Sequence, residues 1–138
     1  MPPEYNKEIN VGVSISPEGV VELVLGGNVS SYLHKAELEA WVEEAKAAIA
    51  GQKKKQGGIA TCLVNVEALR DFDEESVAIV KDLAGWHESA DVKTAVIGGT
   101  LFSNMALRTI IIMTGRKNIK SFDSKDDALE WLKSSDTQ

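Results

Sequence analysis

Few side chains in this sequence are of the types that carry out chemistry, and their spacing does not match a catalytic set. The two histidines, His34 and His87, lie far apart, and neither has companion ligands at the spacing that a metal site requires. The single cysteine, Cys62, alternates with apolar residues of an expected strand, which predicts a small core residue rather than a reactive thiol. We therefore expect no metal, no cofactor and no enzymatic activity.

A glycine pair, Gly98 and Gly99, is followed by Thr100 and then by an expected helix. Such a turn could bind an anion, because the first N–H groups of a helix are free to donate. The segment lacks the lysine of a P-loop and the spacing of a dinucleotide fingerprint. We interpret it as the turn that ends a strand.

The expected helix over 101–114 has apolar residues on more than one side. Its first stripe consists of Phe102, Met105, Ala106, Thr109 and Met113. A helix on a sheet needs only one such stripe, so the second stripe of Leu107, Ile110 and Ile111 either packs under the last helix or faces a partner. Together with Arg108, a cation suited to an anionic partner, it is a candidate surface for an apolar ligand, a lipid or a second copy of the chain.

Composition describes an ordinary globular chain. Its 138 residues are 43% hydrophobic and 26% charged, which predicts a single domain over 1–138 with an ordered core over about 7–133. The net charge of −6 disfavours nucleic acid, whose binding depends on lysine and arginine. No signal peptide and no apolar run of roughly twenty residues is visible, so we expect no membrane span. One cysteine allows no internal disulfide, which fits the cytoplasm.

Hydrophobic periodicity predicts an α/β fold with the element order ββαβαβαβα. We expect strands over about 8–15, 20–25, 59–66, 92–97 and 118–122, and helices over about 31–50, 74–89, 101–114 and from Asp123 or Ser124 onward. The turn at 16–19 is too short for a crossover, so the first two strands form a hairpin. Later strands alternate with helices and should pair in parallel, giving a mixed sheet of about five strands.

Two features of this pattern are specific enough to be tested. The first helix carries one apolar stripe, made of Leu38, Trp41, Val42, Ala45 and Ile49. We expect that helix to end at Gly51 and to be followed by a polar surface loop over 52–58, with a further loop over 67–72. The strands over 59–66 and 92–97 are almost continuously apolar, which indicates burial on both faces.

The C-terminal part of the chain carries a family resemblance. A strand and cap over 117–124 are followed by Asp-Ala-Leu-Glu-Trp-Leu at 127–132. With the element order, this resembles the STAS domain, in particular the SpoIIAA-like group of small bacterial proteins, which is similar in fold to CRAL-TRIO lipid-binding domains. The resemblance implies a non-enzymatic regulatory module that binds a protein partner, with a lipid or small apolar ligand as the alternative.

In STAS domains that act as anti-sigma-factor antagonists, a serine at a helix start is phosphorylated within an Asp-Ser-Ser-Gly-like motif. The matching residues here are Asp73, Glu74, Glu75 and Ser76, and Asn65 replaces an aspartate usual near the end of the central strand. The simpler interpretation is helix capping, with acidic residues placed where the helix dipole favours them. The alternative is a partner-binding surface held in a permanently phospho-like state, without the phosphoserine switch.

Overall fold

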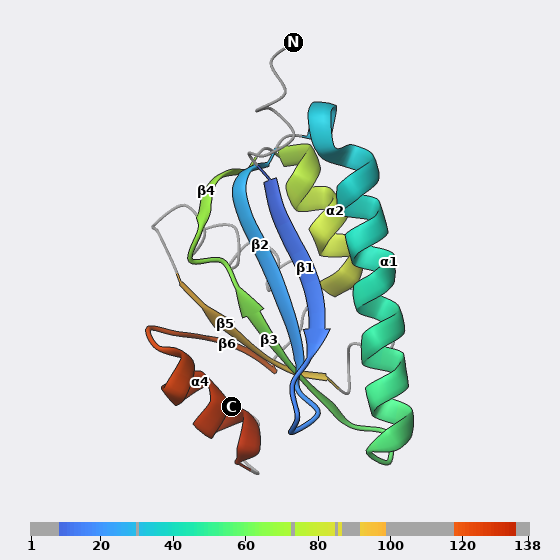
Figure 1. Cartoon of the computed structure of the whole chain (residues 1–138), viewed down its shortest axis with the longest axis vertical. Helices are drawn as coiled ribbons and strands as arrows, with labels where there is room; N and C mark the ends of the chain where they lie inside the picture. Colours follow the sequence, from blue (N-terminus) through green and yellow to red (C-terminus); the bar gives the residue numbers. More distant parts are fainter. Residues whose placement is uncertain are drawn as a thin grey trace.

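The computed structural model describes residues 9–29, 31–72, 74–84, 86, 92–98 and 118–134, which form one mixed sheet with helices on both faces (Figure 1). In chain order the elements are β1 (Ile9–Ile15), β2 (Val21–Val29), α1 (Ser31–Lys55), β3 (Ala60–Asn65), β4 (Leu69–Phe72), α2 (Glu74–Ala84), β5 (Val92–Ile97), β6 (Ile119–Phe122) and α4 (Lys125–Lys133). The strand order is β1-β2-β3-β5-β6, and β4 pairs separately with β2. Only β1 and β2 run antiparallel among these pairs, so the predicted mixed sheet is confirmed.

The hairpin between β1 and β2 is closed by a tight turn over 16–19. Ser16 accepts a hydrogen bond through Oγ from the backbone N–H of Val20 (3.1 Å), and its own N–H donates to the Val20 carbonyl (2.9 Å). Gly19 has a φ of 87°, a conformation that glycine adopts without steric cost. The predicted hairpin is therefore formed by the residues expected to form it.

Alternate residues of the two central parallel strands enter two separate cores. Ala60 and Cys62 of β3 pack with α1, whereas Leu63 packs with α4. In β5, Val96 faces the first core and Ala95 the second. Helices α1 and α2 therefore cover one face of the sheet and α4 covers the other, as Figure 1 shows. The prediction that these strands are buried on both faces is confirmed, and so is the core position of Cys62.

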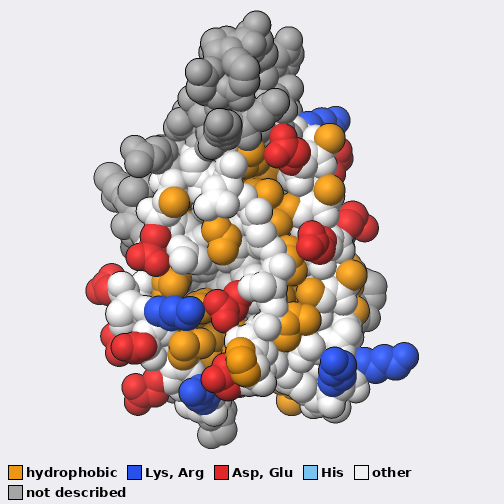
Figure 2. All heavy atoms as spheres, in the orientation of Figure 1, with side chains coloured by type: hydrophobic (Ala, Val, Ile, Leu, Met, Phe, Trp, Pro, Cys, Tyr) orange, Lys and Arg blue, Asp and Glu red, His pale blue; other side chains and the backbone are white. Residues whose placement is uncertain are grey.

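Helix α1 docks its predicted apolar stripe against the sheet, and Figure 2 shows hydrophobic side chains along the seam between them. All five residues of that stripe are buried. The indole N–H of Trp41 also donates to the carbonyl of Gly12 (3.0 Å), which ties α1 to the edge strand β1. Covering an edge in this way limits pairing with other chains.

The predicted end of α1 at Gly51 is wrong, because the helix continues to Lys55. A glycine within a helix costs only about 1 kcal/mol relative to alanine, and burial of Gln52 and Lys53 against the fold offsets that cost. The helix ends at Lys55, and Gly57 follows in the closing turn, where its φ of 77° allows the N–H of Gly58 to donate to the Lys53 carbonyl (2.7 Å).

The segment predicted as a loop over 67–72 contains a sixth strand, β4. Strand β2 extends beyond its pairing with β3, and the free part pairs in parallel with β4 around a register shift between Gly27 and Asn28. The N–H of Gly27 donates to the Ala68 carbonyl (2.8 Å), which starts this pairing. The long β2 therefore provides a partner that local sequence patterns do not reveal.

Hydrogen bonds stabilise helix α4 at both of its ends. Ser124 caps its start by accepting a hydrogen bond from the N–H of Asp127 (3.2 Å), as predicted. At the other end, the buried Lys93 of β5 donates to the carbonyls of Trp131 and Ser134 and lies 4.5 Å from the centre of the Trp131 ring. A cation at this position adds a donor to carbonyls at the end of the helix and complements the helix dipole.

Replacement of Lys93 by methionine keeps the aliphatic stem and removes the ammonium group. Because the Ser134 carbonyl then loses the Lys93 donor and the Trp131 carbonyl keeps only its bonds from Ser134, we expect the free energy of unfolding to fall by about 1–3 kcal/mol, measured by urea denaturation. The matched control is Lys133→Met in the last turn of α4, an exposed site where we expect a change within about 0.5 kcal/mol. Equal effects of the two substitutions would contradict the role assigned to Lys93.

Candidate functional site

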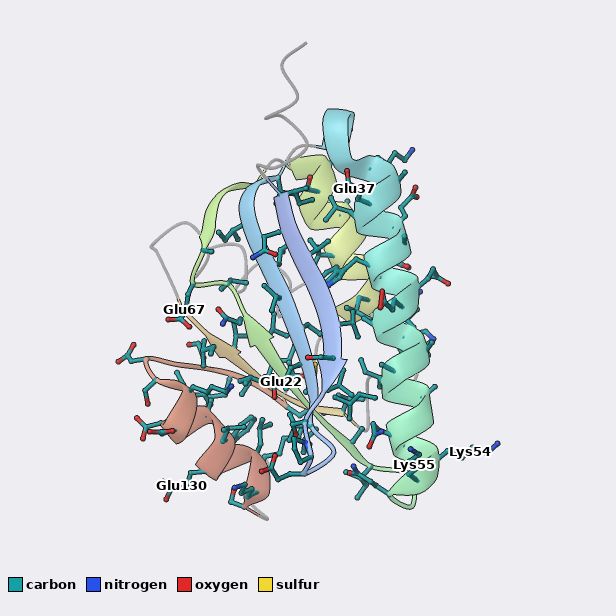
Figure 3. The ribbon with its side chains drawn as sticks, viewed as in Figure 1. Glu22, Glu37, Lys54, Lys55, Glu67 and Glu130 are labelled. Carbon is teal, nitrogen blue, oxygen red and sulfur yellow. The ribbon has the colours of Figure 1, made fainter. Side chains whose placement is uncertain are left out.

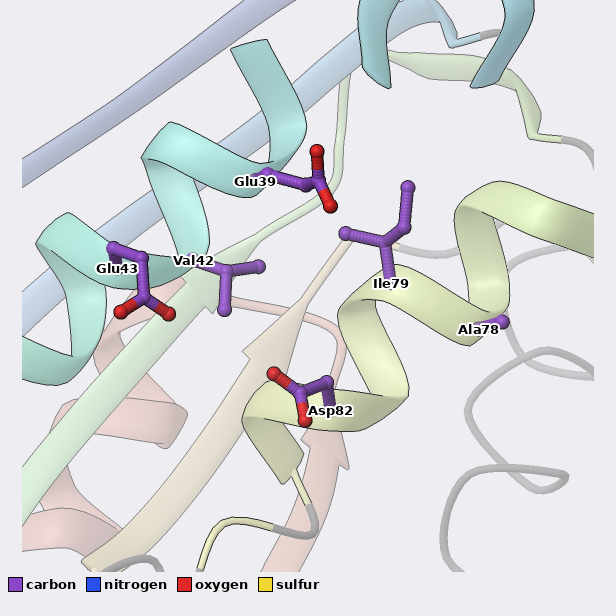
Figure 4. Close-up of a pocket in the computed structure, with 6 residues that line it drawn as sticks. All are labelled: Glu39, Val42, Glu43, Ala78, Ile79 and Asp82. Atoms are coloured by element: carbon purple, nitrogen blue, oxygen red, sulfur yellow. The ribbon is translucent and has the colours of Figure 1, made fainter. Parts of the chain in front are cut away.

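Helices α1 and α2 lie side by side and leave between them a groove of about 470 Å³ (Figure 4). The lining residues are Glu39, Val42, Glu43, Ala78, Ile79 and Asp82. Val42 from α1 and Ile79 from α2 point toward one another across the gap, with carboxylates around them. The groove thus combines an apolar centre with an acidic rim.

Helical spacing explains why these residues meet. Glu39 and Glu43 are one turn apart and each follows a buried residue of the stripe that faces the sheet, so they emerge at the edge of α1 nearest α2. On α2, Ile79 and Asp82 are three positions apart and share the side that faces α1. Glu75 precedes Ile79 by four positions, so the same side of α2 continues with an exposed acidic residue.

Lys46 closes one end of the groove. Its Nζ lies 2.9 Å from Asp82 and 3.4 Å from Glu43, and it also lies 5.9 Å from the centre of the Trp86 ring. The hydrogen bond to Asp82 is the main reason that the pKa of Lys46 is raised above its usual value of 10.5. This pair therefore stabilises the fold at neutral pH, and on the alkaline side its contribution is lost as the pH rises through the raised pKa.

The charges along the groove do not balance. Three carboxylates line it and Lys46 neutralises part of that charge at the Asp82 end. Within the described part of the chain, Glu39 at the other end has no cationic partner. No histidine or cysteine lines the groove, and the described residues contain no cluster of histidine, cysteine and carboxylate side chains able to hold a metal ion. The arrangement is suited to binding a cationic and apolar group.

The predicted surface at the start of α2 contains one exposed residue and one buried residue. Glu75 is exposed, whereas Ser76 has a relative exposure of 0%. Asp73 and the side chain of Glu74 lie outside the described residues. Whether a partner contacts this helix start stays a prediction, and Ser76 contributes to packing rather than to the accessible surface.

The second predicted surface, Leu107, Arg108, Ile110 and Ile111, lies outside the described residues. The same holds for His87, for Gly99 and Thr100, for the side chain of His34 and for the whole helix expected over 101–114. The apolar pocket that a lipid carrier would need near that helix therefore stays a prediction.

Asn65, the residue that replaces the aspartate of the family pattern, closes the turn after β3. Its Oδ1 accepts a hydrogen bond from the N–H of Glu67 (2.9 Å), a contact that a carboxylate could make equally well. Gly98 approaches the same turn from β5 with a φ of 88°, and a Cβ there would lie 2.5 Å from the Glu67 nitrogen. This close contact supports the interpretation of Gly98 as a turn residue.

Sequence analysis missed the groove. A signal was present, because Glu39 and Glu43 border the apolar stripe of α1 at a spacing of one turn. That signal is indistinguishable from an ordinary solvated helix face until α2 is placed beside α1. Adjacency of the two helices is a property of the tertiary structure alone.

Comparison with known proteins supports the fold. No protein-family model matches the sequence, and no curated protein matches it. Among solved structures, the chain is similar to an uncharacterised protein of the DUF3478 family with a SpoIIAA-like fold from Shewanella loihica PV-4. The two share 21% identity over 90% of this chain and 93% of the other, with a TM-score of 0.55. The chain therefore has a SpoIIAA-like fold, and the predicted resemblance is confirmed at that level.

A search for membrane-spanning elements in the described residues finds no helix of sufficient length and apolar character to cross a bilayer.

Substitution of Gly98 by alanine tests the turn. Because the left-handed φ is strained for alanine and the added Cβ meets the Glu67 backbone, we expect a loss of about 2 kcal/mol or more in the free energy of unfolding. Gly12→Ala in β1 is the control, since no atom lies within 4 Å of its Cβ position, and we expect a change within about 0.5 kcal/mol. A tolerated Gly98→Ala would contradict the close approach.

A double-mutant cycle with Lys46→Gln and Asp82→Asn tests the link between α1 and α2. Because Asp82 is largely exposed, we expect a coupling energy of only about 0.5 kcal/mol in urea denaturation, reduced in high salt. A parallel cycle of Lys46→Gln with Glu44→Gln, an exposed residue outside the groove, should give no coupling. A coupling of zero between Lys46 and Asp82 would show that the pair does not hold the helices together.

Proposed function

We propose that this chain is a non-enzymatic module that binds a regulatory protein partner through the surface formed by α1 and α2. The observation that carries the proposal is the acid-rimmed apolar groove between these helices. A groove with an apolar centre and charged margins has the composition of protein-recognition sites, in which burial supplies affinity and charge supplies specificity. The SpoIIAA-like fold agrees with such a role, since the resemblance implies anti-sigma-factor antagonists of this type.

The proposed module works without the usual phosphoserine switch. Ser76 is fully buried, so its hydroxyl group is not presented to a kinase in this conformation. Glu75 is exposed in the same turn and supplies a negative charge without modification. The start of α2 would then act as a permanent recognition surface, adjoining the groove.

A protein partner fits this surface better than a lipid does. The three carboxylates around the groove repel fatty acids and anionic headgroups, whereas a protein segment can present complementary cations. A lipid site or a dimer surface at Leu107, Arg108, Ile110 and Ile111 is the alternative proposal. We place the module in the cytoplasm, in keeping with its single cysteine, which is buried and allows no internal disulfide.

Site-specific photo-crosslinking in cells of the native host tests this proposal. With a photoreactive amino acid in place of Glu75, we expect a covalent adduct between this chain and another polypeptide, seen as a mass shift on a denaturing gel. The matched control carries the same group at Glu130, an exposed residue of α4 that Figure 3 shows far from α1 and α2. No adduct from Glu75, or equal adducts from both positions, would overturn the proposed surface.

A further inference from the structure

We infer that the groove between α1 and α2 binds a basic amphipathic segment of the partner, with an aliphatic side chain inserted between Val42 and Ile79 and flanking lysine or arginine side chains on the acidic rim. This inference rests on the proposed function and adds the chemistry of the partner. It follows from the shape of the groove, the unequal distribution of its charges and the exclusion of other occupants.

The apolar centre of the groove sets the first requirement for the partner segment, an aliphatic side chain. The accessible apolar surface comes mainly from the half-buried Ile79, because Val42 is only 2% exposed, and the whole groove has a volume of about 470 Å³. That space accommodates a branched aliphatic side chain, and burying such a side chain contributes about 1.5–3 kcal/mol. A purely polar or purely charged segment would leave this apolar surface without a partner.

The acidic rim of the groove sets the second requirement for the partner segment, positively charged side chains. Glu39 and Glu43 are one helical turn apart, so their backbone positions differ by roughly 6 Å along the axis of α1. Cations four positions apart on a partner helix have the same spacing. Because Lys46 already pairs with Asp82 and Glu43, the preferred position for an incoming cation is beside Glu39, which forms no ion pair within the described residues although Lys35 lies one turn earlier on α1.

Other occupants match these requirements less well. A phosphate or an anionic lipid has the wrong sign for three carboxylates. A second copy of this chain has one suitable segment, since Lys54 and Lys55 lie exposed at the far end of α1 and Ile59 is 64% exposed (Figure 3). Such a contact joins two different surfaces, so unless it is made reciprocally it generates rings or open filaments rather than a dimer. We therefore assign the groove to a different protein, and the second copy is an outcome of the test.

Fluorescence anisotropy with designed peptides tests the inference. The probe is a labelled helical peptide of leucine and lysine, with lysines four positions apart on each side of a leucine stripe. One control peptide has glutamate in place of lysine, and another has serine in place of leucine. We expect the leucine–lysine peptide to bind the full chain and both control peptides to bind at least about tenfold more weakly.

Variants of the full chain locate the binding site. Glu39→Lys should weaken binding of the leucine–lysine peptide by about tenfold, and the milder Glu39→Gln by a smaller factor. Glu37→Lys and Glu130→Lys change the same net charge at exposed sites outside the groove and should alter affinity less than about twofold. No binding, or equal loss in all three lysine variants, would overturn the inference, because attraction would then depend on net charge alone.

Light scattering of the free protein separates the second copy from a different partner. We expect the mass of one chain for the wild-type protein and for Ile59→Asp. A larger wild-type mass that Ile59→Asp abolishes would overturn the inference in favour of self-association. If the peptide fails to bind while the adduct from Glu75 persists in cells, this inference alone is wrong. Loss of that adduct would overturn the proposed function itself.

Discussion

Burial of β3 and β5 on both faces is the constraint on which the rest of the structure depends. Each strand sends alternate side chains into opposite cores, so neither core can form unless helices cover both faces of the sheet. The long helix α1 supplies most of one cover and α4 supplies the other.

Lys93 is the exception within this apolar centre. It lies in a strand whose residues are all buried, yet its ammonium group reaches the end of α4 and binds carbonyls that would otherwise lack donors. The cost of burying a charge is offset because the group has several acceptors and the face of Trp131 nearby. One polar contact in the core thus fixes the position of the helix that covers the second face.

The groove between α1 and α2 follows from the same packing. Two helices lying on one face of a sheet meet along their edges, and side chains at those edges belong neither to the core nor to open solvent. Here those edge positions carry the carboxylates of Glu39, Glu43 and Asp82 around Val42 and Ile79. Carboxylates at such an edge are expected to pair with cations of the neighbouring helix. Among the described residues Lys46 forms such a pair, with Asp82, and the groove keeps an excess of negative charge.

The sequence by itself determined most of the secondary structure and the fold class, because periodicities of 2 and 3.6 residues and the hairpin turn at 16–19 are local signals. It also identified the apolar stripe of α1 and the Ser124 cap. Only the tertiary structure decided that α1 runs past Gly51 and that β4 pairs with the free part of β2. The burial of Ser76 and the position of Glu39 beside Ile79 are also known only from the tertiary structure. These contacts join residues distant in sequence and depend on packing that no local pattern encodes.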